Sequence, residues 1–102
     1  MEEICKSEEL ERLMEIYKLF GSVPRLKILL HLNKGECIAS KLAEVAGISQ
    51  SATSHQLKDL KKSRIIKSRK VGMNVFYRLS DQHIVKMLES GIEHVLKENC
   101  NE

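Results

Sequence analysis

Residues 42–85 read LAEVAGISQSATSHQLKDLKKSRIIKSRKVGMNVFYRLSDQHIV, and this stretch decides the fold. Its first half predicts a helix-turn-helix over about 38–63. Gly47 can end the first helix of this pair, because glycine readily adopts the left-handed backbone found at helix ends. The Ser49 hydroxyl can cap the second helix by accepting a hydrogen bond from a free backbone N–H group.

The second half of the stretch predicts a two-stranded hairpin over about 65–79. Val75, Tyr77 and Leu79 alternate with Phe76 and Arg78, as expected of a strand whose successive side chains point to opposite faces. Gly72 and Asn74 tolerate the backbone conformations that a tight turn requires. A helix-turn-helix followed by such a hairpin, the wing, is a winged helix-turn-helix.

Amphipathic helices are predicted on both sides of this stretch. Apolar residues recur every three or four positions over about 7–20 and over about 81–98, and Asp81 can cap the latter helix. A further helix is predicted after Ser22. Few aromatic residues and a single proline favour helices, and 102 residues suffice for one core. We therefore expect a single domain over 1–102, mainly α with a small β-hairpin.

Charge is distributed unevenly along the chain. Residues 41–78 hold nine basic and two acidic side chains, a net charge of +7, whereas residues 1–20 carry a net charge of −3. A basic segment of this kind favours polyanionic partners. One end of the domain is therefore expected to bind nucleic acid.

The second helix of the helix-turn-helix has an apolar and a polar face. Thr53, Leu57 and Leu60 fall at helical spacing and are expected to face the core. The opposite face carries hydroxyl, amide and basic side chains, which suit base edges and phosphates in a major groove. The predicted DNA-binding residues are Gln50, Ser51, Ser54, His55, Lys58 and Lys62 on this helix, and Lys67, Arg69 and Lys70 on the hairpin.

The same stretch resembles the core of the ArsR/SmtB family of metal-sensing repressors. The resemblance is carried by SHQL at 54–57, FYRL at 76–79, PRLKILLHL at 24–32 and the helix that begins near Asp81. It covers most of the chain. It implies a homodimer joined by the first and last helices, which binds a palindromic operator in double-stranded DNA and represses transcription.

The last helix carries candidate metal ligands. His83 and His94 are 11 residues apart, so they share a helical face but lie about 16 Å apart along the axis. One helix cannot bring both to one ion. Two helices packed antiparallel about a twofold axis near Leu88 and Glu89 would place Asp81 and His83 of one chain beside His94 of the other.

The resemblance implies a fourth ligand three residues after His94, where this chain has Lys97. Glu98 is one position further and can still reach, with water as the alternative. Nitrogen and oxygen ligands favour Zn(II), then Co(II) or Ni(II). The predicted metal ligands are Asp81, His83, His94 and Glu98, and the metal is expected to release the repressor from DNA.

The three cysteines lack the spacing of a zinc or disulfide framework and are expected to be reduced. The resemblance implies that Cys37 stands where some family members have the first cysteine of a metal-sensing ELCVCD motif. Ala39 stands at the place of the second cysteine of that motif. Cys5 could join Cys37 in a second metal or thiol site. A thiol-responsive or a metal-indifferent regulator remains an alternative, but Leu30 and Leu96 stand where thiol-sensing relatives have paired cysteines.

Several classes of protein are not indicated. The chain has no His-Glu-x-x-His run or other motif that activates water, so we expect no enzyme. No apolar run reaches the roughly 20 residues of a membrane span, and the acidic start differs from a secretory signal. A cytoplasmic protein is expected.

Overall fold

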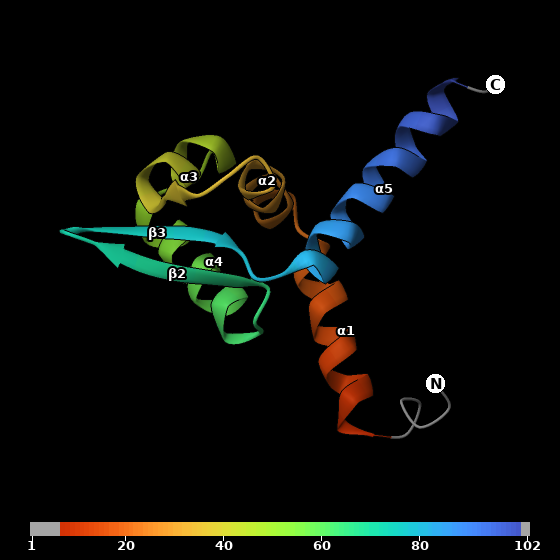
Figure 1. Ribbon diagram of the computed structural model, residues 1–102, viewed down its shortest axis with the longest axis horizontal. Coiled ribbons are helices and arrows are strands. Elements are labelled where there is room, and N and C mark those ends of the chain that lie inside the picture. The colour runs from red at the N-terminus through yellow and green to blue at the C-terminus, as the bar shows by residue number, and fades with distance from the viewer. Residues whose placement is uncertain (1–6, 101–102) are drawn as a thin grey trace.

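The computed structural model describes residues 7–100, and its elements follow the order of a winged helix-turn-helix (Figure 1). The predicted fold class, mainly α with a small antiparallel sheet, is confirmed. The elements are α1 (Glu8–Phe20), α2 (Val23–Leu32), β1 (Cys37–Ile38), α3 (Ala39–Ala46), α4 (Gln50–Lys62), β2 (Ile66–Val71), β3 (Asn74–Leu79) and α5 (Gln82–Cys100).

The sheet has three strands in the order β1-β3-β2, all antiparallel. β2 and β3 form the predicted hairpin, with Ile66 opposite Leu79, and Gly72 lies at the turn with φ 61°. β1 was not predicted from the sequence. Its two residues pair with Tyr77 and Phe76, and so short a strand has no periodicity that a sequence pattern could reveal.

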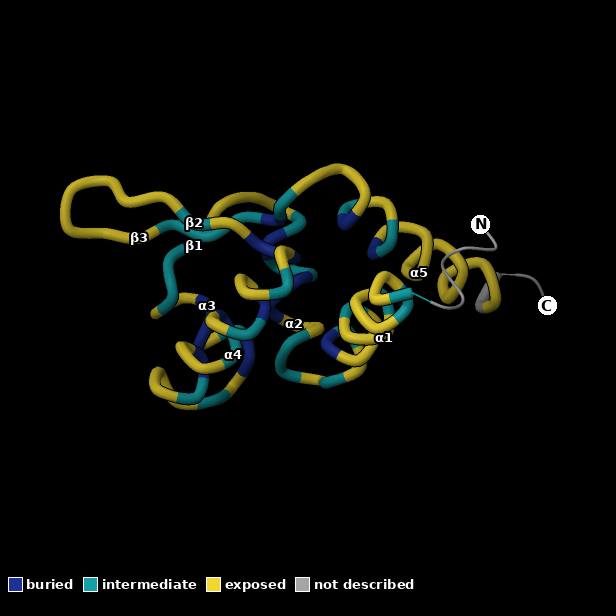
Figure 2. Tube along the Cα trace, turned by 90° about the horizontal axis from the view of Figure 1, so that it is seen from below, coloured by how far each residue is buried: buried dark blue, intermediate teal, exposed yellow. Residues whose placement is uncertain are grey.

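The core lies between α2, α3, α4 and the base of the wing (Figure 2). Ile28, Leu42 and Ile65 have no solvent-exposed surface. The helix-turn-helix is capped as predicted: Gly47 has the left-handed φ of 71°, and the Ser49 hydroxyl accepts a hydrogen bond from the Ala52 N–H at 3.0 Å. These caps fix where α3 ends and α4 begins.

The helices α1 and α5 lie at the end of the molecule opposite the wing tip, and most of α5 projects away from the body (Figure 1). Apolar side chains on both helices are exposed: Met14, Tyr17, Val95 and Leu96. Neither apolar stripe is fully covered within one chain. None of the helices in residues 7–100 is long and apolar enough to cross a lipid bilayer.

One expectation about α5 needs correction. Leu88, which we expected near a twofold axis between two copies of α5, is only 5% exposed and belongs to the core of its own chain. Its neighbour Glu89 accepts a hydrogen bond from the Asn33 amide at 3.2 Å. At 3.6 residues per turn, Leu88 lies about 140° around the helix from His83, so it faces away from the histidines.

Candidate nucleic-acid interface and metal ligands

The helix α4 presents one buried and one exposed face. Thr53, Leu57 and Leu60 are at most 1% exposed, and the Thr53 hydroxyl donates to the Ser49 carbonyl at 2.9 Å, so its polar atom is satisfied inside the core. The helical residues predicted to bind DNA share the other side of α4, and all are exposed: Gln50, Ser51, Ser54, His55, Lys58 and Lys62.

Within this face His55 has a carboxylate neighbour. Its Nε2 lies 3.7 Å from the Asp59 Oδ2, one helical turn further on. The imidazole therefore lies close to a negative charge on the exposed side of α4. Lys58 and Lys62 form no ion pair within the described part of the chain, so their charges are available to phosphates.

The three basic residues predicted on the wing are not equivalent. Lys67 and Lys70 are exposed and have no carboxylate within 4 Å among residues 7–100. Arg69 instead forms two hydrogen bonds with the carboxylate of Glu36, each 2.7 Å long, and its guanidinium lies 5.9 Å from the centre of the Phe76 ring. A phosphate would have to compete with Glu36 for this guanidinium.

This ion pair joins the wing to the segment before α3. The hydrogen bond from Arg69 lowers the pKa of Glu36, and the same bond raises the pKa of Arg69. Glu36 was not predicted from the sequence. The two residues are 33 positions apart, and a single glutamate before a helix has no pattern that marks its partner.

The first candidate metal pair lies at the start of α5. Asp81 Oδ1 accepts backbone hydrogen bonds from His83 at 2.9 Å and from Ile84 at 3.2 Å, so it caps the helix as predicted. The bond from the Ile84 N–H is the largest cause of the lowered pKa of Asp81. The His83 Nδ1 lies 3.6 Å from the same oxygen, and the imidazole is 91% exposed.

The second candidate pair lies near the end of α5. The His94 Nε2 is 3.1 Å from Glu98 Oε2, and both side chains are exposed. Within residues 7–98 no three side chains of the types His, Cys, Asp and Glu meet closely enough to hold a metal. The four predicted ligands therefore form two separate pairs in one chain, and a four-ligand site requires a second copy.

The described residues favour the candidate thiol site less than they favour the imidazole and carboxylate pairs at the two ends of α5. Cys37 is 8% exposed, and burial raises the pKa of its thiol, which opposes the thiolate needed for metal binding. Cys5 lies outside the described residues.

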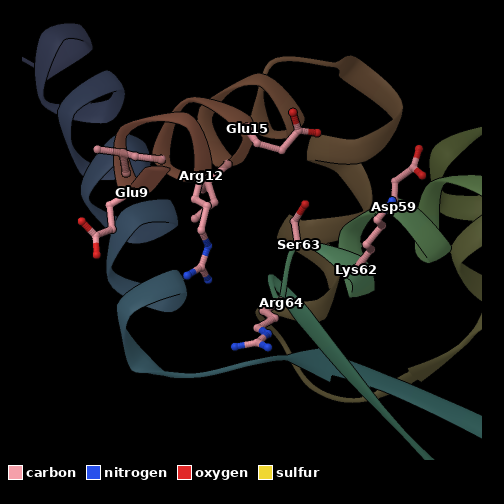
Figure 3. A pocket seen from close by; sticks show the side chains of 9 residues that line it. Glu9, Arg12, Glu15, Asp59, Lys62, Ser63 and Arg64 are labelled. Atoms are coloured by element: carbon pink, nitrogen blue, oxygen red, sulfur yellow. The ribbon is translucent and has the colours of Figure 1, made fainter. Parts of the chain in front are cut away.

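An open cavity of about 770 Å³ lies between α1 and the end of α4 (Figure 3). The guanidinium groups of Arg12 and Arg64 point into the same space. Arg64 has a φ of 62°, and its N–H donates to the Lys61 carbonyl, so it ends α4 in the left-handed conformation usually taken by glycine. The cavity adjoins the last turn of α4.

Comparisons with known proteins agree with this architecture. A family model described as bacterial regulatory protein, arsR family, matches residues 22–68. A transcriptional repressor SmtB homolog from Synechocystis sp. is 30% identical over 91% of this chain and 70% of the relative. Among solved structures, the AntR antimony-specific transcriptional repressor superposes with a TM-score of 0.78 at 28% identity, over 92% of this chain and 86% of that one.

The fold is also that of a homodimeric winged helix-turn-helix DNA-binding domain from Mycobacterium bovis, with a TM-score of 0.78 at 23% identity, over 88% of this chain and 82% of that one. Family and fold are those of DNA-binding regulators and not of an enzyme. The chain belongs to the ArsR/SmtB family of winged helix-turn-helix transcriptional repressors.

Proposed function

We propose that this protein is a homodimeric repressor that binds a palindromic operator and is released from it by Zn(II) or a similar transition-metal ion, with Co(II) and Ni(II) as the next candidates. The observation that carries the metal-responsive part is the pairing of imidazole with carboxylate at two places, one at the start of α5 and one near its end. These pairs are Asp81 with His83 and His94 with Glu98.

The DNA-binding part of the proposal is supported by the exposed face of α4. Ser54 and His55 lie there together with lysines, so base edges and phosphates can be contacted from one helix face. The wing adds Lys67 and Lys70 beside it. In a dimer, the α4 helix of each protomer would lie in the major groove and each wing would contact the flanking backbone. The two half-sites of the operator would then lie about 34 Å apart.

The metal part requires two copies of α5. Each chain supplies two pairs of ligands separated by about three helical turns. Antiparallel packing would bring the first pair of one chain beside the second pair of the other, twice per dimer. Each site would then have up to two nitrogen and two oxygen ligands, which suits tetrahedral Zn(II).

The surface of α5 supports such packing. Ser90 and Gly91 lie between the histidines on the same side of the helix, both are exposed, and a Cβ added to Gly91 would meet open space. Exposed Val95 and Leu96 provide apolar area for association. Among the similar structures, the domain from M. bovis is homodimeric and AntR is antimony-specific, which favours a dimer and an inorganic effector here.

The decisive experiment titrates metals while operator binding is followed. A duplex recovered by the protein from a random-sequence library is labelled, and its anisotropy is measured with apo protein and with Zn(II), Co(II), Ni(II) or Cd(II). We expect Zn(II) to weaken binding at least tenfold, which is within the usual range of coupling free energies.

His83→Ala and His94→Ala should each bind the duplex like wild type but no longer respond to Zn(II). His31→Ala, which changes a histidine on α2, is the matched control. If neither metals nor chelators alter binding, the protein is a metal-indifferent regulator. If only thiol oxidants alter operator binding, the protein is a thiol-responsive regulator.

A further inference from the structure

The side chain of Arg25 on α2 contacts two other helices. Its Nε donates to the Leu19 carbonyl at 2.8 Å, and its Nη2 lies 3.4 Å from the Lys18 carbonyl. Both carbonyls belong to the last turn of α1. Its Nη1 donates to the Gln56 Oε1 on α4 at 2.8 Å. One half-buried guanidinium thus joins the end of α1 to the middle of α4.

These contacts use the charge of the guanidinium at the end of α1 and its several N–H donors between α1 and α4. The carbonyls of the last turn of α1 carry the negative end of the helix dipole, which a cation stabilises, and the Lys18 carbonyl also accepts from the Gly21 N–H at 3.1 Å. The planar guanidinium has five N–H donors in a fixed arrangement, so it can bind two helices at once. A lysine has a single nitrogen and cannot span the same acceptors.

The bond to Gln56 also fixes the orientation of its amide. Because Oε1 accepts from Arg25, the NH₂ group must point the other way, and it can only donate. Gln56 is half-buried and lies between exposed His55 and buried Leu57. Among residues 7–100 no other side-chain hydrogen bond joins α4 to α1 or α2.

We propose that Arg25 is a positioning residue that sets the orientation of the DNA-reading helix α4 relative to α1. α1 is one of the two helices expected to form the dimer interface, so Arg25 would connect dimer geometry to operator recognition. This inference rests on the proposed reading of DNA by α4. The connection that it describes, from the dimer interface to α4, does not include the metal ligands on α5.

The proposal predicts a loss of specificity rather than of general DNA affinity. If α4 is no longer held at its angle, base contacts fail, while lysine contacts to phosphates persist because they do not require exact alignment. We expect Arg25→Gln and Gln56→Met each to lower the ratio of operator to scrambled-duplex affinity about tenfold. Arg25→Lys should not restore the ratio.

The test is a double-mutant cycle measured by anisotropy. The probes are a duplex recovered by wild type from a random library and a scrambled duplex of equal length. Arg25→Gln, Gln56→Met and the double variant are compared with Lys27→Gln, which removes an exposed charge from the same helix. The two changes should be non-additive, so that the double variant loses no more specificity than either single variant.

Two outcomes would overturn the proposal. If the losses of the single variants add, Gln56 acts on DNA independently of Arg25. If Gln56→Met keeps the wild-type ratio, the bridge does not position α4. Should Arg25→Gln fail to fold, Gln56→Met still decides, because it removes only the α4 end of the bridge. A wild type that recovers no preferred duplex would instead contradict the proposed operator binding.

Discussion

The Arg69 guanidinium and the Glu36 carboxylate form a two-pronged ion pair, with both N–O distances at 2.7 Å. The pair fastens the wing to the segment that precedes α3. It also engages one of the three basic residues that the sequence assigned to DNA. Glu36 occupies the Nε and Nη2 donors of Arg69 and offsets its positive charge, so we expect Glu36 to oppose phosphate binding by this guanidinium.

Glu36→Gln should strengthen DNA binding at low salt, because the variant frees Arg69 and removes a negative charge. If the freed guanidinium neutralises one more phosphate in each protomer, the slope of log affinity against log salt should steepen by about two per dimer. Anisotropy titrations at several salt concentrations measure this slope. Glu11→Gln, on exposed α1, controls for the change in net charge. An unchanged slope would show that the freed Arg69 guanidinium does not bind a phosphate.

Acid should weaken the anchoring of the wing. The folded-state pKa of Glu36 is lowered by Arg69, so its contribution to stability is present above its unfolded pKa and is lost as pH falls through the lowered folded value. The same sign holds for Asp81, whose pKa is lowered first by the Ile84 N–H. Glu36→Gln should therefore show a smaller fall in Tm than wild type on acidification below pH 5, as measured by circular dichroism. An equal fall in both proteins would contradict this.

Specificity should depend on the exposed face of α4. Ser54→Ala and His55→Ala are expected to reduce discrimination between operator and scrambled DNA, since a good base contact is worth about 1–3 kcal/mol. Lys67→Ala should instead weaken both duplexes alike and flatten the salt slope by about two per dimer. Competition titrations separate the two effects. If His55→Ala keeps full discrimination, His55 is not a base-reading residue.

The fourth metal ligand can be tested at Glu98, which already lies 3.1 Å from His94. Glu98→Gln should weaken Zn(II) binding at least tenfold and reduce metal-driven release, because it removes a charged oxygen ligand. Lys97→His should tighten binding by adding a nitrogen ligand at the spacing implied by the family resemblance. Glu93→Gln is the control. If Glu98→Gln is silent and Co(II) spectra show a higher coordination number, water is the fourth ligand.

Self-association and folding should depend on different residues of α5. Leu88 is buried, so Leu88→Ala should destabilise the fold by about 2–5 kcal/mol. Val95 is 56% exposed in one chain, so Val95→Glu should leave the protomer folded and weaken self-association. Chemical denaturation and sedimentation at micromolar concentration measure the two effects. A wild type that sediments as a monomer would contradict the proposed dimer.

The sequence by itself determined the helices, the hairpin and the buried face of α4. Spacings of three and four residues placed Thr53, Leu57 and Leu60 on one side, and local signals at Gly47 and Ser49 marked where helices end and begin. The predicted DNA and metal residues followed from the same local patterns and from the family resemblance. Both sets remain predictions. For the metal ligands, a single chain contains only half of each proposed site.

Only the tertiary structure decided which distant residues meet. Arg25 and Gln56 are 31 positions apart, Arg69 and Glu36 are 33 apart, and β1 is too short to be recognised before β3 lies beside it. Hydrophobic periodicity predicts which face of an element is buried, because apolar side chains at helix or strand spacing fall on one side. It cannot predict which exposed or half-buried polar groups pair, because hydrogen bonds depend on distances and angles that exist only after the elements have packed. Leu88 was assigned to an interface because it lies between the two histidines in the sequence, and only packing decided that its own chain buries it.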